Sequence, residues 1–435
     1  GAVTVNQAGN NFQSTVTASG TNVALRDTDA IQLGNITATG TFGVTAGTNI
    51  TQAAATAVIV TGTTSLTATA GLITLEQTGN DFQNTVTASG TDISLRDANA
   101  LQIGNITATA TVKLQSGSGQ DISRSAGTIS GTIVRLISAG SIGTAVNPIQ
   151  TVVGKVAGSA NGNIYITDSG TTAGGVNIGA GDGNADNLAG LTTTSATGVI
   201  RFEETANPQG IVAAEAVSAV GGGVTILAHS PLTVNAAVSD NGGGNILLAA
   251  EGQTAADDLT INANVTASGG NGNIQLYAGD SISVAAAQIV SATGMGTVTA
   301  IAGTDYNSGT PQDGTSSGGI GMASDAEIRT EDGNITLRAP GDISVAVLNA
   351  NSDADAARGA VIVSADDSGV SGTQSNNVGA ITDANAATLN VTAQSLELKA
   401  ATGIATSANR LELNVGTVAG RVVCEAVLMF TMVDA

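Results

Sequence analysis

The single histidine, His229, is the first residue to consider for chemistry because Ser230 follows it in the segment Leu227-Ala-His-Ser-Pro231. An imidazole beside a hydroxyl is the start of a nucleophilic site, but such a site also needs a carboxylate that orients the imidazole. No carboxylate lies near His229 in the sequence, and one histidine cannot supply a metal cage. We therefore interpret His229 as a residue at a strand-to-turn transition and assign no catalytic residue.

Adjacent carboxylates occur at Asp257-Asp258, Asp366-Asp367 and Glu203-Glu204. Glycoside hydrolases need two carboxyl groups about 5 to 10 Å apart that flank the sugar. The sugar usually packs on aromatic rings, yet this sequence has no Trp and its three Tyr residues are scattered. We therefore expect the acidic pairs to be solvated loop charges, and we expect no organic cofactor.

Acidic turns are the second place where chemistry can occur, because Ca²⁺ takes oxygen ligands. Asp182 and Asp186, in Asp-Gly-Asn-Ala-Asp, resemble half of the calcium site of a β-roll nonapeptide. The loops around Asp353, Asp355 and residues 331–332 are further places for divalent ions, at contacts between subunits. Calcium is thus the one ion that the sequence suggests, and the alternative is an acidic turn without a ligand.

The tripeptide Gly-Asn-Ile occurs six times. Because Gly and Asn tolerate a left-handed backbone, we expect them to form turns before a buried strand that Ile opens. Asn-x-Thr sequons also recur, and they accept a glycan only in a compartment that holds the enzyme. The sequon asparagines are Asn35, Asn49, Asn105, Asn264, Asn334 and Asn390.

Two Leu-Arg-Asp segments place Arg26 beside Asp27 and Arg96 beside Asp97. Because both lie at the same place in a duplicated unit, we expect a structural role. The expected role is an outward-facing pair or a bond from Arg to a turn carbonyl, worth at most about 1 kcal/mol if exposed.

Composition excludes several classes of function. The formal charge is −21, from 13 basic and 34 acidic residues, whereas a nucleic-acid binder needs clustered Lys and Arg. No stretch approaches the roughly 18 apolar residues of a membrane-spanning helix. Aromatic residues make up only 2% of the 435 residues, but hydrophobic residues make up 42% and Gly accounts for 58 positions. A repetitive fold explains this composition better than several globular domains or a disordered chain.

Internal repeats indicate the architecture. Residues 3–41 realign on residues 73–111 at an offset of 70, with 25 identities in 39 positions. A further internal similarity relates the segment that begins at Asn271 to the segment that begins at Asp332. Within these units apolar residues alternate, which predicts strands with one buried face. Only Ile381–Ala387 suggests a helix, and we interpret it as a longer loop.

Short strands joined by Gly and Asn turns, in units of roughly 20 to 30 residues, are typical of a parallel β-solenoid. We predict an all-β fold in which residues 1–420 form one elongated rod, with coils of roughly 20 residues. Inserted loops are expected at Gly303–Gly319 and Asn351–Asn377, and residues 421–435 form a C-terminal strand or junction segment.

The motifs GNIxLxAxxxI, LRDxxAxQxGNITA and IxTxxNxxxxxVGxVAG resemble the repetitive shafts of filamentous-haemagglutinin-like exoproteins and related giant bacterial surface proteins. The resemblance covers most of residues 1–420. It implies a right-handed parallel β-helix, export to the bacterial surface and a role in adhesion or in surface filaments. Asn207-Pro-Gln-Gly-Ile211 is similar to the NPNGI signature of two-partner-secretion proteins, with Gln209 departing from it.

The ends of the chain suggest how copies assemble. Gly1–Val5 begins in mid-pattern without Met, which predicts a processed or excised piece. Exposed strand edges are templates for strand addition, and a head-to-tail contact that does not close generates a filament. The expected junction residues are Val3, Val5, Val427, Leu428, Met429 and Phe430.

The sequence therefore predicts a non-enzymatic extracellular protein, a filament subunit or an adhesin shaft at a bacterial surface. Its predicted partners are further copies of itself or the rest of a longer chain, with cell-surface glycans and divalent cations as further candidates. The alternative is a carbohydrate-active β-helix enzyme, a polysaccharide lyase or hydrolase. A groove that gathers carboxylates with perturbed pKa values would favour that alternative.

Overall fold

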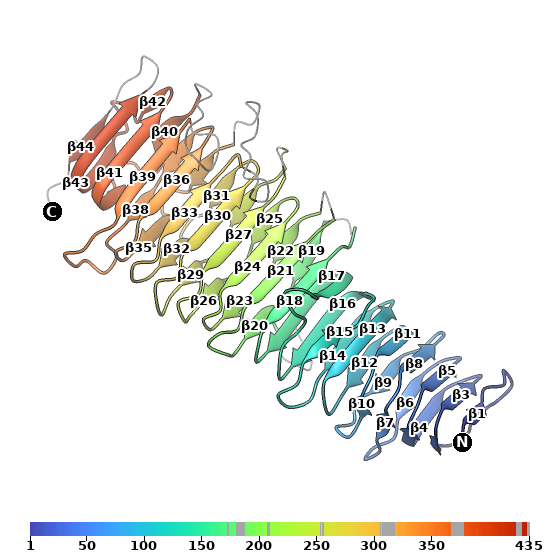
Figure 1. Ribbon diagram of the computed structural model, residues 1–435. Coiled ribbons are helices and arrows are strands. Elements are labelled where there is room, and N and C mark those ends of the chain that lie inside the picture. The colour runs from blue at the N-terminus through green and yellow to red at the C-terminus, as the bar shows by residue number, and fades with distance from the viewer. Residues whose placement is uncertain are drawn as a thin grey trace. The chain divides into compact units, whose positions relative to one another are not determined.

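The computed structural model describes all residues except 172–173, 180–187, 207–208, 253, 255, 305, 307–317, 367–377, 423–428 and 433–435. All regular elements of the described residues are strands, and the strand pairs are parallel (Figure 1). The predicted parallel β-solenoid is therefore confirmed. The chain divides into two compact units, Gly1–Thr172 with Val176–Phe202, and Ala173–Gly175 with Glu203–Ala435.

Unit 1 holds short strands of 2 to 12 residues. They are β1 (Val3–Val5), β2 (Val16–Gly20), β3 (Val23–Asp27), β4 (Ile31–Ala38), β5 (Phe42–Ala46), β6 (Ile50–Gln52), β7 (Val58–Val60), β8 (Thr64–Ala68), β9 (Ile73–Leu75), β10 (Asp81–Phe82), β11 (Val86–Gly90), β12 (Ile93–Arg96), β13 (Leu101–Ala108), β14 (Thr111–Gln115), β15 (Ile122–Arg124), β16 (Ile129–Ser138), β17 (Ile149–Ala160), β18 (Ile164–Asp168), β19 (Val176–Ile178) and β20 (Leu191–Thr193). Strand β21 (Ile200–Glu204) crosses the division between the units.

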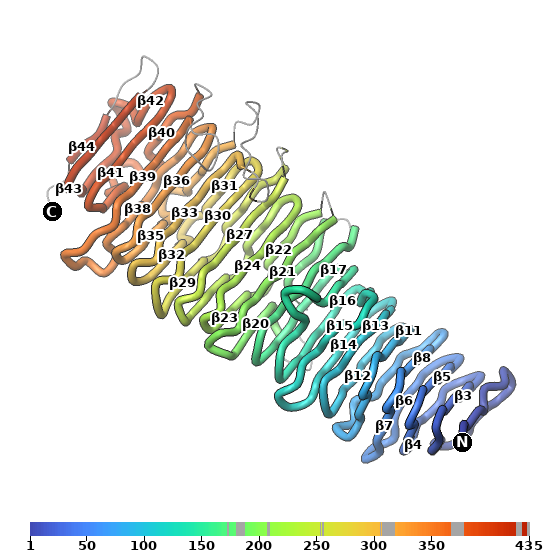
Figure 2. Tube along the Cα trace, in the orientation of Figure 1, coloured from blue at the N-terminus to red at the C-terminus, as the bar shows by residue number. Residues whose placement is uncertain are grey.

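Each of the first coils of unit 1 passes through three ladders of stacked strands. Ladder A contains β1, β3, β5, β8 and β11; ladder B contains the first half of β4 with β6, β9, β12 and β14; ladder C contains β2, the second half of β4, β7 and β10. Figure 2 shows β3, β5, β8 and β11 side by side. Successive partners in ladder A, at Val3, Val23, Phe42 and Thr64, lie 19 to 22 positions apart, as predicted for the coil length.

Unit 2 is built in the same way. Its strands are β22 (Ile211–Ala213), β23 (Val217–Ala219), β24 (Val224–Ala228), β25 (Leu232–Val234), β26 (Val238–Asp240), β27 (Ile246–Ala250), β28 (Leu259–Ile261), β29 (Val265–Ala267), β30 (Ile274–Ala278), β31 (Ile282–Val284), β32 (Ile289–Ala292), β33 (Val298–Ile301), β34 (Ile320–Met322), β35 (Glu327–Thr330), β36 (Ile335–Ala339), β37 (Ile343–Val345), β38 (Val347–Asn349), β39 (Ala360–Ala365), β40 (Ala380–Asp383), β41 (Val391–Ala400), β42 (Gly403–Ile404), β43 (Leu411–Val422) and β44 (Phe430–Met432).

In most of unit 2 each strand pairs with the strand three positions later in the chain, as β22 does with β25 and β23 with β26. Figure 2 shows one such ladder, β24, β27, β30 and β33, and their register is Val224, Ile246, Ile274 and Val298. The predicted core is confirmed: Ile335, Leu337 and Ile343 are 0% exposed and Val345 is 1% exposed. These side chains point inward because alternate residues of a strand face opposite sides.

Two sequence predictions about loops are corrected by the strands. Ile381 belongs to β40 and stacks between Ile343 and Ile404, so the start of Ile381–Ala387 is strand instead of loop. The loop predicted at Asn351–Asn377 is interrupted by β39, whose alternate valines are buried. Part of that loop and most of Gly303–Gly319 lie outside the described residues.

Insertions are visible in the spacing of partners. Most steps between partners in the ladder that starts at β22 span 21 to 27 positions, whereas Ile282 pairs with Ile320 and Ile343 with Ile381, 38 positions apart. Where the first insertion begins, the ring of Tyr306 packs on Tyr277 with centroids 4.9 Å apart. Tyr277 belongs to a small outward-facing cluster with Leu227 and Ile301 that is nevertheless buried.

Candidate functional site

His229 follows β24, and coil stacking brings a carboxylate to it that the sequence does not reveal. Its Nε2 lies 3.4 Å from Oε2 of Glu251, which is 22 positions away and nearly buried. Its Nδ1 lies 2.5 Å from the backbone oxygen of Glu204. Because both ring nitrogens face protein oxygen atoms, neither is placed to take a proton from Ser230. This arrangement favours a structural role, pairing the imidazole with a buried carboxylate.

The acidic pairs are not simply solvated loop charges. Glu204 is 0% exposed and Asp257 is 3% exposed. A carboxylate oxygen of Glu204 accepts a hydrogen bond from the backbone N–H of Ala206, and Oδ2 of Asp257 accepts the N–H of Thr254 at 2.6 Å. Asp366 is also buried, while Asp367 lies outside the described residues. The expectation was wrong for Glu204, Asp257 and Asp366, which are buried, and backbone N–H groups replace water at Glu204 and Asp257.

The two Leu-Arg-Asp segments place Arg outside and Asp inside. Arg26 is exposed, whereas Asp27 and Asp97 are almost fully buried. Oδ2 of Asp27 accepts the N–H of Phe12 at 2.9 Å, and Oδ2 of Asp97 accepts the N–H of Phe82 at 3.2 Å. Burial raises the pKa of Asp97 to about 6, and hydrogen bonds from the backbone N–H groups of Asn99 and Phe82 partly offset this rise. The predicted outward-facing pair is wrong, since neighbours in a strand face opposite sides.

The asparagines of Gly-Asn-Ile do not adopt a left-handed backbone: the non-glycine residues with positive φ are five Ala and Asp366 among the described residues. Each instead accepts, through Oδ1, a backbone N–H from the next coil. Asn35 accepts from Ala57 at 2.9 Å and Asn334 accepts from Ala360 at 2.8 Å. The remaining four bonds are Asn105 with Thr128, Asn163 with Val199, Asn245 with Asn273, and Asn273 with Thr297.

The glycine of this tripeptide is needed for close approach. A Cβ at Gly333 would lie 1.9 Å from the backbone oxygen of Gly296, and a Cβ at Gly272 would lie 2.2 Å from that of Gly244. The motif therefore joins coils through a side chain and leaves room for the neighbouring backbone. One sequon, at Asn390, is fully buried, and its Nδ2 donates to Asp383, among other oxygen atoms, at 2.9 Å. That amide is not accessible for glycan transfer in the folded chain.

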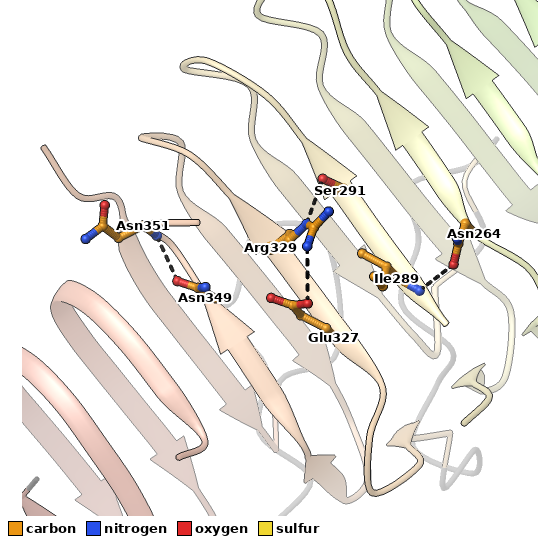
Figure 3. A network of polar contacts seen from close by, with 7 residues as sticks. All are labelled: Asn264, Ile289, Ser291, Glu327, Arg329, Asn349 and Asn351. Carbon is orange, nitrogen blue, oxygen red and sulfur yellow. Dashed lines mark hydrogen bonds and ion pairs between the residues drawn. The ribbon is translucent and has the colours of Figure 1, made fainter. Parts of the chain in front are cut away.

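Surface polar groups on one side of unit 2 also link neighbouring coils (Figure 3). Nε of Arg329 donates to Oγ of Ser291 at 3.2 Å, and its guanidinium lies 3.5 Å from Glu327. In the same region Oδ1 of Asn264 accepts the N–H of Ile289 at 2.9 Å. The Arg329–Ser291 bond gives β32 and β35 an additional side-chain link across the ladder, and the Asn264–Ile289 bond joins β32 to the turn before β29.

Among the described residues, one group of carboxylates has the geometry to hold a metal ion. It consists of Asp332, Asp353 and Asp355, whose ligand atoms all lie within 4.8 Å of one another. The acidic loops named from the sequence are thus brought together by stacking of β38 on β35. The other proposed calcium residues, Asp182 and Asp186, lie outside the described residues.

The predicted junction residues are only partly described, since Val427 and Leu428 lie outside the described residues. Val3 and Val5 lie on β1, which pairs with β3, and Phe430 lies on β44, which pairs with β43. Strand β43 runs across the proposed boundary at residue 420. Met429 precedes β44, and its N–H donates to Ile404 at 3.1 Å.

Four grooves bear on the enzyme alternative. The groove nearest His229 has a volume of about 370 Å³ and is lined by Ser230, Pro231, Ile211 and other residues without a carboxylate. The other three carry one carboxylate each, Glu412, Glu397 and Asp342. Burial and the nearby Asp383 raise the pKa of Glu412. A pair of carboxyl groups flanking a sugar is not assembled in these four grooves.

These features define the class of the protein, a parallel β-solenoid with internal repeats. Residues 20–89 match the family described as repeats of unknown function (DUF5649). The matched segment is as long as the offset of 70 between the duplicated segments. Comparison with curated proteins and with solved structures gives no match. Within the described residues, no helix is long and apolar enough to cross a membrane.

Proposed function

We propose that this chain is a non-enzymatic structural protein of a bacterial cell surface, a filament subunit or adhesin shaft whose coils continue end to end. The observation that carries the proposal is a difference in burial between equivalent residues of the two duplicated segments. Phe82 is 1% exposed and Val86 is 0% exposed, because β7 and β8 stack beneath them. Their equivalents in the first coils, Phe12 and Val16, are only partly buried.

A further coil stacked before β1 and β2 would cover the apolar surface of Phe12 and Val16 as β7 and β8 cover Phe82 and Val86. At the other end, β44 extends the ladder of β43, and Met432 on it is 50% exposed. Parallel strand addition can join two such edges without a change of fold, because the added strands continue the same ladders of backbone hydrogen bonds and stacked side chains. In the proposed assembly, a second copy of the chain supplies the added coil.

The repeated surface supports a shaft more than an enzyme. Outward positions of the three-residue strands hold small polar side chains, such as Thr233, Thr260 and Ser283. The resemblance to filamentous-haemagglutinin-like shafts supports export to the bacterial surface, where the acidic charge keeps neighbouring shafts apart. Surface location is tested by protease treatment of intact cells that make the protein, which should cleave it without lysis.

Assembly is tested by light scattering of the full chain over a range of concentrations. We expect particle mass to grow with concentration, and we expect deletion of residues 421–435 or Val3→Asp/Val5→Asp to abolish that growth. Val146 is 96% exposed within unit 1, so Val146→Asp is the matched control for added charge and should still assemble. A full chain that stays monomeric, or assembly unchanged by the junction variants, contradicts end-to-end assembly of copies.

A second measurement addresses catalysis. Because His229 is held by Glu204 and Glu251, His229→Ala should lower thermal stability and leave binding or assembly qualitatively intact. Cleavage of acidic or neutral polysaccharides by the full chain, lost in His229→Ala, would instead favour the carbohydrate-active enzyme.

A further inference from the structure

Three carboxylates from two coils of unit 2 converge beside an exposed turn. Strand β35 ends at Thr330 and Asp332 follows it; strand β38 ends at Asn349 and Asp353 and Asp355 follow it. Because β35 and β38 pair in parallel, the turns after them lie one above the other. The ligand atoms of the three aspartates lie within 4.8 Å of one another, although like charges repel at such distances.

A buried neutral oxygen in the turn that carries Asp353 and Asp355 is a second, independent observation that points to a ligand. Asn351 is 7% exposed, and its Oδ1 has no hydrogen-bond partner. Its Nδ2 donates to the backbone oxygen of Asp355 at 3.3 Å, which places the carboxamide inside the turn that carries Asp353 and Asp355. A buried acceptor without a donor is costly to the folded state, so such an atom usually has a partner.

The carboxylates show the same lack of a counter-charge. Oδ1 of Asp332 is also buried and without a hydrogen-bond partner. Desolvation raises the pKa of Asp332, and the charges of Asp355, Asp353 and Glu331 raise it further. Glu331 itself accepts the backbone N–H of Gly294. No ion pair joins these residues to a lysine or arginine in the described part of the chain.

We propose that Asn351, Asp353, Asp355 and Asp332 form a binding site for a hard divalent cation, with Ca²⁺ as the ion that fits. The turn presents side-chain oxygens at alternate positions, 351, 353 and 355, and the neighbouring coil adds Asp332. Ca²⁺ accepts six to eight oxygen ligands in variable geometry, whereas Mg²⁺ demands a near-ideal octahedron. The ion joins two successive coils, and the proposal does not depend on end-to-end assembly.

The probe is CaCl₂ added to chelator-treated full chain, with binding measured by calorimetry and the melting temperature measured in parallel. We expect saturable binding with Kd of about 0.1 to 1 mM, the range of extracellular calcium modules, and a rise in melting temperature. Asp353→Asn/Asp355→Asn should lose the calcium response and should melt higher than the wild type without calcium, because repulsion is relieved. Asn351→Ala should weaken binding about tenfold or more, and Asn351→Asp should strengthen it.

A second acidic cluster serves as the matched control. Asp257, Asp258 and Asp280 also lie close together, but among the described residues none of their oxygens is buried without a hydrogen-bond partner, so Asp258→Asn should leave the calcium response unchanged. Absence of saturable binding overturns the proposal. So does an equal rise in melting temperature with NaCl at matched ionic strength, or a calcium response that persists in Asp353→Asn/Asp355→Asn. If Asp353→Asn/Asp355→Asn fails to melt cooperatively, Asn351→Ala is used in its place. A Kd for calcium that Asn351→Ala leaves unchanged also overturns the proposal.

Discussion

The two duplicated segments, residues 3–41 and 73–111, make the same contacts on different sides of unit 1. In the first, Asp27 accepts the N–H of Phe12, and in the second, Asp97 accepts the N–H of Phe82. Yet Val23 stacks in ladder A with Phe42, whereas its equivalent Ile93 stacks in ladder B. The local hydrogen bonds therefore depend on the sequence of the unit itself and not on the ladder in which it lies.

The change of ladder follows from the length of the repeat. Starting from Val3, three coils of ladder A lead to Thr64, and the remaining nine residues lead to Ile73, which is in ladder B. Likewise Ala18 is in ladder C and its equivalent Ala88 is in ladder A. An offset of 70 residues therefore advances the chain by three complete coils and then to the next ladder of the following coil. Any side chain that recurs once per repeat moves to the next ladder, so consecutive repeats do not display it in one row.

One surface pair differs between the segments in an informative way. Nδ2 of Asn11 donates to Oδ2 of Asp29 at 3.1 Å, and in the second copy Nδ2 of Asn99 donates to Oδ1 of Asp81 at 3.1 Å. The donor and the acceptor have exchanged positions. The hydrogen bond and the single negative charge are retained, which is what a pair under joint constraint would show.

The largest expected effect tests the role of stacking. Phe82→Ala should destabilise unit 1 by about 3 to 5 kcal/mol, because Phe82 is 1% exposed and the cavity is enclosed by stacked coils. Phe12→Ala should cost markedly less, because Phe12 is only partly buried. Urea unfolding followed by circular dichroism measures both. Equal losses would mean that the two copies are packed alike and would remove the stacking explanation.

Much of this fold was readable from the sequence. Alternation in the segments at Ile274 and Ile335 predicted inward side chains correctly, because a strand has a period of two. The same alternation continues through Ile200, Phe202 and Glu204, so the burial of Glu204 could also have been found. The interpretation as a solvated charge gave residue type more weight than position in the strand.

Contacts between coils were not readable in the same way. His229 meets Glu251 because the coil between them spans 22 residues, whereas the steps between partners elsewhere range from 17 to 43 positions. Coil length depends on corner geometry and on insertions, neither of which alternation reveals. For the same reason the sequence named the acidic loops of Asp332 and Asp353 separately, and only the register of β35 with β38 brings them together.

The second expected effect concerns pH. The pKa of Asp97 is raised by burial from 3.8 to about 6, so the folded state holds this proton more tightly than the unfolded state. Its contribution to the free energy of unfolding is therefore complete below pH 3.8 and is lost as pH rises through about 6. The change is on the order of 1 to 3 kcal/mol. Urea unfolding between pH 4 and pH 7 should show this loss.

Asp97→Asn is the corresponding variant, since the neutral amide resembles the protonated carboxyl group. It should flatten the pH dependence between pH 4 and pH 7. Burial also raises the pKa of Asp168, which contributes in the same direction and leaves some slope in the variant. A slope unchanged by Asp97→Asn would contradict titration of Asp97 in this range.

The smallest expected effect tests the exchanged pair directly. Asn99→Asp places two carboxylates opposite each other at Asp81, near the buried Asp97, and should cost roughly 1 kcal/mol. The double variant Asp81→Asn/Asn99→Asp recreates the arrangement of Asn11 and Asp29 and should regain most of that loss. Asn84→Asp adds the same charge at another exposed position of the segment and serves as the control for net charge. A double-mutant cycle in urea at pH 7 measures the coupling, expected at about 0.5 to 1 kcal/mol. Additive losses would show that the exchange carries no constraint, and the likeness of the two copies would then rest on the buried aspartates and the stacked core.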